Sequence, residues 1–184
     1  VWWPTNNNIQ NSPVILNSQV ISSATAFTPG PGLTVSYNTG DTNVFGVDQP
    51  NYAAAVASGD YIEYHFTMAQ AADFLGVDLR RGGTNVGRDI ALSISKDGFA
   101  TSDLLLVDST HETDAINLGA QAFGHQFASS YRLEAGESYT VRIYHYNSTI
   151  GPNVTVDNVS FRMDPYLDTD GDGLLDRLDI DSDN

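Results

Sequence analysis

The stretch Tyr61-Ile62-Glu63-Tyr64-His65-Phe66-Thr67 alternates apolar and polar side chains with a period of two. Ile62, Tyr64 and Phe66 fall on one side of an extended chain, whereas Glu63 and His65 fall on the other. This alternation is typical of a β-strand with one face in a core and one face toward water. Residues 61–67 therefore predict a layered β-structure.

The same pattern recurs along most of the chain, with turn residues such as Gly and Pro between the segments. Short strands at a spacing of roughly 8–12 residues are the pattern of an all-β sandwich. The predicted strands are 14–21, 33–37, 61–67, 73–80, 89–95, 104–108, 138–146 and 154–163. Only residues 53–58 and 111–127 are candidates for helix.

The last predicted strand has a clear end at Pro165. Proline has no backbone N–H to donate to a sheet, and it restricts Asp164 to extended geometry. We therefore expect two parts, a β-sandwich at 1–164 and an acidic segment at 165–184.

Acidic residues dominate the charge, which is −15 for the chain. Residues 168–184 hold seven Asp against one Arg, so the tail is a separate charge block. Nucleic-acid binding is excluded as a function class because affinity for phosphate comes from clustered Lys and Arg. No apolar run reaches the ~18 residues of a membrane span, so we expect no membrane insertion.

The chain has no cysteine, which excludes disulfides, thiolate catalysis and Cys-ligated zinc. An extracellular protein without disulfides needs another stabiliser, and calcium bound through oxygen ligands can supply one. The start Val1-Trp2-Trp3-Pro4 has no initiator Met and no signal-peptide pattern. We therefore expect a monomeric module from a longer chain.

The tail carries the strongest motif, which begins Asp168-Thr169-Asp170-Gly171-Asp172-Gly173-Leu174. Numbered from Asp168, carboxylates stand at loop positions 1, 3, 5, 9 and 12, with Gly at 6 and a backbone carbonyl at 7, as in an EF-hand loop. Flanking helices are absent, and the spacing distinguishes the segment from a solvated acidic linker. The predicted Ca²⁺ ligands in the tail are Asp168, Asp170, Asp172, Leu174, Asp176, Asp179, Asp181 and Asp183.

This tail resembles the thrombospondin type 3 calcium repeat of large extracellular bacterial proteins, including adhesins. The resemblance covers about a tenth of the chain and implies a calcium-stiffened connection between domains. Residues 179–184 begin a second loop that shares Asp179, so the resemblance also implies an array.

Residues 59–163 resemble the jelly-roll domains of secreted bacterial proteins, a group whose fold overlaps with carbohydrate-binding modules. The resemblance implies an all-β, jelly-roll-like antiparallel sandwich. It rests on the segments Gly59–Tyr64, Phe74–Arg81, Ser95–Phe99, Ala135–Tyr144 and Val156–Val159.

Asp157 lies among apolar residues of the last predicted strand, where an unpaired carboxylate is costly. The jelly-roll resemblance implies that an Asp at this place can hold a structural calcium. The alternative is a bulge that turns Asp157 and Asn158 toward solvent.

Two loop regions are candidates for ligand binding. The segment 80–89 gathers three Arg and three Gly, and a guanidinium can orient a carboxylate through paired hydrogen bonds. The segment 146–152, bordered by His145, forms a loop at one end of the sandwich, where ligand contacts often lie. The alternative is that the Arg side chains pair with the domain's own Asp. The predicted ligand-binding residues are Arg81, Asn85, Arg88, Asp89, His145 and Asn147.

Catalysis is not expected. His111-Glu112 lacks the second His of a metalloprotease helix, and no Gly-x-Ser-x-Gly occurs. A glycosidase carboxylate pair stays open as an alternative, because two carboxylates can meet in space from anywhere in the chain.

Three functions follow from these features. The first is a calcium-dependent module of a bacterial cell-surface adhesin that recognises a peptide carboxylate on a partner cell. The second is a carbohydrate-binding module of an adhesin or of a secreted enzyme. The third is a structural spacer domain.

Overall fold

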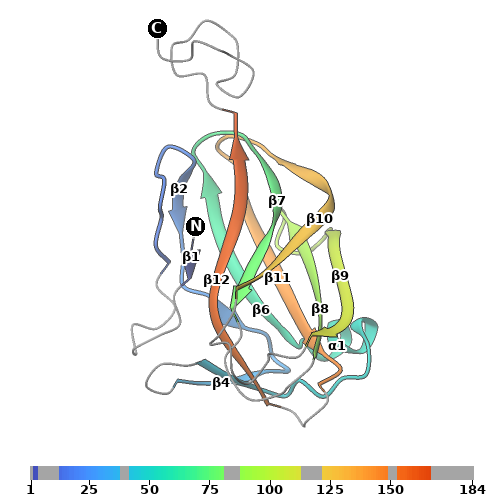
Figure 1. Ribbon diagram of the computed structural model, residues 1–184. Coiled ribbons are helices and arrows are strands. Elements are labelled where there is room, and N and C mark those ends of the chain that lie inside the picture. The colour runs from blue at the N-terminus through green and yellow to red at the C-terminus, as the bar shows by residue number, and fades with distance from the viewer. Residues whose placement is uncertain are drawn as a thin grey trace, which may run out of the picture.

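The computed structural model describes residues 2–3, 13–37, 42–80, 88–112, 122–148 and 153–166. Two antiparallel sheets of six strands each face one another (Figure 1). The acidic segment 167–184 lies outside the described residues, so the predicted domain division stays a prediction.

The first sheet, sheet A, has the order β10-β7-β12-β5-β4, with β1 paired to β12. The second, sheet B, has the order β2-β6-β11-β8-β9, with β3 paired to β6. Sheet A comprises β1 Trp2–Trp3, β4 Thr34–Tyr37, β5 Thr42–Phe45, β7 Ala72–Arg80, β10 Ala122–Leu133 and β12 Asn153–Pro165. Sheet B comprises β2 Ile21–Ala24, β3 Thr28–Pro29, β6 Tyr61–Met68, β8 Arg88–Ser95, β9 Asp103–Glu112 and β11 Ser138–Tyr146.

The strand order defines the topology of the sandwich. From β5 onward, β5-β12-β7-β10 of sheet A lie opposite β6-β11-β8-β9 of sheet B, and the chain changes sheet at every connection except β8 to β9. Eight strands in this arrangement form a jelly roll. The predicted jelly-roll-like, all-β sandwich is confirmed.

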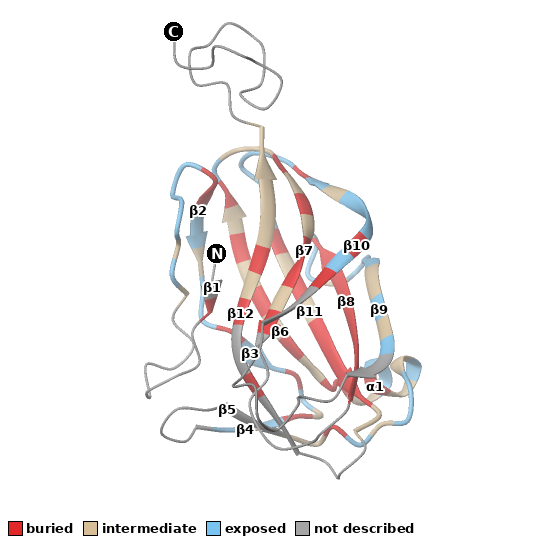
Figure 2. Cartoon of the chain, viewed as in Figure 1, coloured by how far each residue is buried: buried red, intermediate tan, exposed pale blue. Residues whose placement is uncertain are grey.

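Buried positions run along the strands of both sheets (Figure 2). Several of the side chains in the core between the sheets are aromatic. Trp3 is fully buried, with ring centroids 5.0 Å from Tyr64 and 4.8 Å from Phe161. Its indole nitrogen donates a hydrogen bond to the Thr25 carbonyl oxygen at 2.8 Å. The short strand β1 therefore fastens the N-terminal region to both sheets.

Most predicted strands are confirmed with shifted ends, and the first of the two candidate helices, at 53–58, is present as α1, Tyr52–Ser58. Among the residues that the structure describes, no helix is long and apolar enough to cross a membrane.

The predicted strand at 14–21 is wrong. The Asn17 side chain accepts a hydrogen bond from the Gln19 backbone N–H at 2.9 Å, and the Asn17 carbonyl accepts from Val20 and Ile21 at 3.2 and 3.1 Å. These bonds form a turn, since Asn side chains compete for local backbone donors. Strand β2 begins only at Ile21.

The second candidate for helix is residues 111–127. The described parts of that range, 111–112 and 122–127, are strand instead. Strand β9 runs through Glu112, and β10 begins at Ala122 and pairs with β7. The register of that pair shifts between Gln126 and Tyr131. A strand interrupted in this way shows only a weak alternation of apolar and polar residues. Its extended structure is set by the strand with which it pairs.

We predict that Trp3→Ala lowers the free energy of unfolding by about 3–5 kcal/mol, because it leaves a large cavity between the sheets. Urea unfolding followed by circular dichroism measures the change. The control is Leu16→Ala, at a side chain that is 74% exposed, for which we expect a change within about 0.5 kcal/mol. Equal destabilisation by both variants would contradict the placement of β1 in the core.

Candidate functional site

Helix α1 covers one half of the outer face of sheet B. The Asn51 side chain caps the helix by accepting from the Ala54 N–H at 3.0 Å, and Gly59 ends it with φ 80°. Ala55 and Tyr52 pack on Ala91, Tyr144 and Tyr146 of the sheet. Burial raises the pKa values of both sheet tyrosines, so their phenols stay neutral.

The other half of that face carries polar side chains from two central strands, most of them partly exposed. Three cross-strand pairs of β6 and β11 stand in direct register there: Thr67 with Ser138, His65 with Thr140, and Glu63 with Arg142. Each pair is joined through its side chains, at 2.9, 3.0 and 2.7 Å respectively. We call this half the polar face, made up of Ser23, Thr25, Tyr61, Glu63, His65, Thr67, Phe99, Ser138, Thr140 and Arg142.

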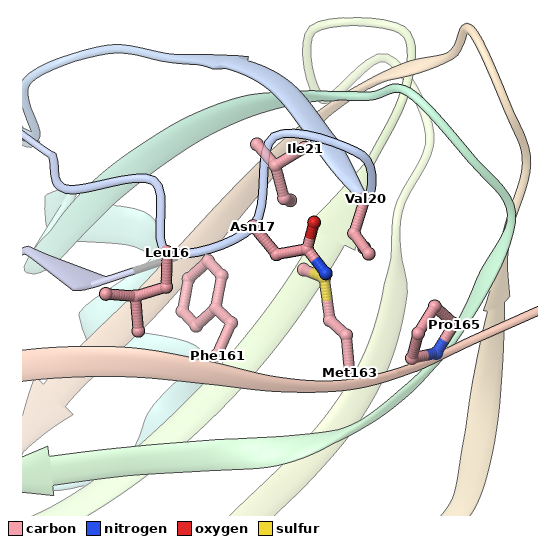
Figure 3. Close-up of a pocket in the computed structure, with 7 residues that line it drawn as sticks. All are labelled: Leu16, Asn17, Val20, Ile21, Phe161, Met163 and Pro165. Atoms are coloured by element: carbon pink, nitrogen blue, oxygen red, sulfur yellow. The ribbon is translucent and has the colours of Figure 1, made fainter. Parts of the chain in front are cut away.

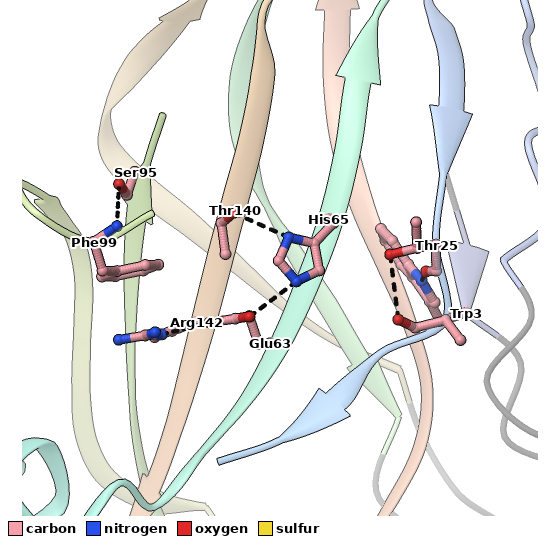
Figure 4. A network of polar contacts seen from close by, with 9 residues as sticks. Trp3, Thr25, Glu63, His65, Ser95, Phe99, Thr140 and Arg142 are labelled. Atoms are coloured by element: carbon pink, nitrogen blue, oxygen red, sulfur yellow. Dashed lines mark hydrogen bonds and ion pairs between the residues drawn. The ribbon is translucent and has the colours of Figure 1, made fainter. Parts of the chain in front are cut away.

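Glu63 lies at the centre of the contacts on the polar face (Figure 4). One carboxylate oxygen accepts from Arg142 Nε at 2.7 Å, and the other lies 2.9 Å from His65 Nε2. The side chain of Glu63 is 16% exposed, that of Arg142 22% and that of His65 40%. A half-buried ion pair is screened by water less than a surface pair, so these contacts hold the three side chains in one geometry.

The guanidinium of Arg142 lies between two aromatic rings. Its central carbon is 4.1 Å from the ring centre of Tyr61 and 3.8 Å from that of Phe99. A planar guanidinium is attracted to the faces of aromatic rings at these distances. The result is a layered ring–guanidinium–ring group at one border of the polar face.

The turn between β8 and β9 holds Phe99 in this position. Ser95 Oγ accepts from the Phe99 N–H at 2.9 Å, and Asp97 accepts from both the N–H and the hydroxyl of Thr101. Phe99 itself has φ 66°, a conformation that costs free energy for a side chain of this size. The Ser95 and Asp97 hydrogen bonds offset that cost and keep the ring over Arg142.

A shallow hollow lies on the polar face where β2 meets β6. Its lining includes Ser23, Thr25 and His65, together with Thr67, Ser138 and Thr140 from the two central strands. Hydroxyl groups both donate and accept hydrogen bonds, so this lining suits a ligand rich in hydroxyl groups. Glu63 already has a partner at each oxygen, which favours a role in positioning its neighbours.

The predicted ligand-binding residues lie at a different place. Arg88, Asp89 and His145 are 2%, 4% and 0% exposed, and Asn147 donates to an Asp89 carboxylate oxygen at 2.9 Å. The structure thus brings Asp89 and Asn147 together. It buries the side chains of Arg88, Asp89 and His145 at one end of the sandwich. Arg81 and Asn85 lie outside the described residues, and ligand binding there stays a prediction.

The period of two explains why Arg88 and His145 are buried. Arg88 continues the inward row of Ile90 and Leu92, and His145 continues the inward row that contains Ile143. In strands β10 and β9, the buried His125 places Nδ1 2.8 Å from a carboxylate oxygen of Asp108, whose side chain is 16% exposed. These polar groups support the end of the sandwich from inside.

The structure does not test the predicted metal ligands. The side chain of Asp157 and all of Asp168 to Asp183 lie outside the described positions. The backbone pairing shifts register between Asp157 and Val159, but the side-chain directions that distinguish the two readings lie outside the described positions. Within the described ranges, no group of three or more His, Asp or Glu side chains is placed to hold a metal ion.

Sequence reasoning missed the polar face, although part of its signal was visible. Glu63 and His65 stand on the wet face of one alternating strand, and Arg142 stands on the wet face of another. Their meeting depends on the pairing of β6 with β11, across a separation of 79 residues between Glu63 and Arg142.

No family model matches the chain, and no curated protein matches it. Among solved structures, the chain is similar to one described as CBM32 of AlyQ in complex with 4,5-unsaturated mannuronic acid. The identity is 10% and the TM-score 0.43, over 74% of this chain and 97% of that chain. A similarity this low supports no conclusion about function. The function of the chain is inferred from the geometry of the polar face.

We predict that Asp97 titrates with a pKa of about 2, because its carboxylate accepts hydrogen bonds from Thr101 and then from Ser95. A pKa below the ordinary value of 3.8 means that this stabilisation is present above pH 3.8 and is lost as the pH falls through about 2. Carbon-detected NMR of the labelled carboxylate measures the titration.

The test variant for this titration is Thr101→Val, which we expect to raise the pKa of Asp97 toward 3.8. Thr34→Val, on sheet A, is the matched control and leaves the titration unchanged. An Asp97 pKa that is the same in all three proteins would show that Thr101 does not hold the turn.

Proposed function

We propose that this chain is a non-catalytic carbohydrate-binding module and that its glycan lies on the polar face of sheet B. The observation that carries the proposal is the row of three joined cross-strand pairs, bordered by the layered group of Tyr61, Arg142 and Phe99. A sugar presents hydroxyl groups and apolar C–H surfaces, and this face offers partners for both.

The polar face suits a sugar because its side chains are held before any ligand arrives. His65 can donate to Glu63 through Nε2 and accept from Thr140 through Nδ1, which leaves lone pairs of the Thr140 hydroxyl for a ligand hydroxyl. Side chains fixed on central strands lose little conformational entropy on binding. Preorganisation of this kind raises affinity without new contacts.

Charge favours a glycan over a peptide carboxylate. Arg142 forms an ion pair with Glu63, so its positive charge is already neutralised. His65 contacts the same carboxylate. In a chain of net charge −15, a ligand carboxylate gains little at this face. A neutral, hydroxyl-rich ligand avoids that repulsion.

The acidic tail supports an extracellular setting for the module. We propose that residues 168–183 bind Ca²⁺, because the carboxylate spacing with Gly173 at the sharp turn matches a calcium loop. A chain without cysteine gains stability from such an ion where calcium is abundant. The setting that fits these features is a bacterial surface adhesin whose module binds glycans of a partner cell.

We predict that Arg142→Met weakens glycan binding by at least about tenfold, since hydrogen bonds to charged groups contribute about 1.5–3 kcal/mol. Arrays of neutral oligosaccharides and peptides select the ligand, and calorimetry then measures the affinity of each variant. Thr140→Val, which removes one hydroxyl, has a smaller effect in the same direction.

The matched control for the charge change is Arg162→Met, because Arg162 lies on sheet A and pairs with Asp78 at 3.3 Å. This variant should bind the glycan as the parent does. Unchanged binding by Arg142→Met and Thr140→Val, or capture of peptides alone on the arrays, would contradict the proposal.

We predict that calcium titrated into the chelator-stripped chain gives a saturable binding heat. The double variant Asp170→Asn with Asp172→Asn loses that heat, because two carboxylates no longer face the ion. Asp48→Asn, at an exposed position of the sandwich, keeps it. A flat titration of the parent chain would refute calcium binding by the tail.

A further inference from the structure

An apolar groove lies where the chain leaves the sandwich (Figure 3). Side chains from the segment before β2 and from the end of β12 point into it from opposite sides. Phe161 forms part of its floor, while Leu16 at the rim is 74% exposed. We call this the exit groove, lined by Leu16, Asn17, Val20, Ile21, Phe161, Met163 and Pro165.

Tyr166, the last described residue, is held beside the exit groove by several contacts. Its N–H donates to the Ala71 carbonyl at 2.9 Å, and its carbonyl accepts from the Gln70 side chain. Its hydroxyl donates to Asp73 at 2.7 Å, and the guanidinium carbon of Arg132 lies 3.7 Å from its ring centre. The acidic tail therefore starts from a fixed point, two residues before Asp168.

The tail carries apolar residues as well as carboxylates. Leu174, Leu175, Leu178 and Ile180 stand between the carboxylates of an otherwise polar segment. A loop that turns its carboxylates inward around an ion directs apolar side chains away from the ion, toward water. Exposed apolar surface costs roughly 25 cal/mol per Å² relative to burial. Packing these side chains against a nearby apolar surface therefore lowers the free energy of the chain.

The exit groove is within reach of these residues. Leu174 follows Tyr166 by eight residues, which span at most about 29 Å when fully extended. Pro165, a wall of the groove, directly precedes Tyr166. The cation of Arg132 at the exit also complements the carboxylates of the segment.

We propose that calcium binding docks the segment 174–180 of this chain into the exit groove. The inference rests on the proposed calcium site of the tail, and it adds a contact between the repeat and the sandwich. Docking next to the fixed Tyr166 joins the two parts stiffly, so the orientation of the repeat follows the orientation of the polar face.

Hydrogen exchange of the full chain, with calcium and with chelator, tests this docking. Calcium should slow the exchange of amides at 16–21 and 161–164 on the order of tenfold, because the occupied groove opens less often. The double variant Leu175→Ser with Leu178→Ser should lose that protection but still bind calcium with the same stoichiometry by calorimetry, because neither substitution removes a carboxylate ligand. Its calcium affinity should fall by no more than about tenfold, because docking and calcium binding are linked.

The control variant is Val56→Ser, which changes a 45% exposed side chain on α1, away from the groove. It should keep both the calcium affinity and the protection. Protection that survives the double Leu variant would overturn the docking, as would protection that grows with protein concentration and so reports a second copy in the groove. Calcium binding without any protection would overturn the docking alone, whereas no calcium binding would overturn the calcium site as well.

Discussion

The antiparallel register of β6 and β11 is the constraint on which the other features depend. Seven residue pairs, from Thr67 with Ser138 to Tyr61 with Tyr144, set both faces of sheet B at once. The inward residues Ile62, Tyr64 and Phe66 meet the core, and the outward residues form the polar face. A slip of one residue would exchange the two faces, so the apolar core enforces the geometry of the proposed site.

This dependence explains how much of the fold could be predicted. Strands with one buried face, such as residues 61–67 and 138–146, show their period in the sequence and were placed nearly to the residue. Strand β10 was missed because it contains Gly124 and a register shift, so its alternation is broken. The segment before β2 has apolar residues, yet the Asn17 side chain bonds turn it into a loop.

The candidate site was harder to predict than the fold. A single strand shows which side chains face water, but the partner strand decides which of them meet. Glu63 and Arg142 could be assigned to wet faces, whereas their ion pair follows only from the sheet order. Arg88 and His145 are predicted ligand-binding residues, whereas continuing the period of two from Ile90 and Ile143 places both side chains inside the sandwich, where the structure has them.

The chain combines a rigid sheet face, which offers hydrogen bonds and aromatic rings, with an acidic tail that starts from the fixed Tyr166. NMR titration of the ¹⁵N-labelled chain with an array-selected glycan locates the glycan. Binding on the polar face gives chemical-shift changes concentrated at residues 61–67, 95–99 and 138–142. Changes confined to residues 81–89 and 145–152 would contradict it and would favour the loop end of the sandwich as the binding site.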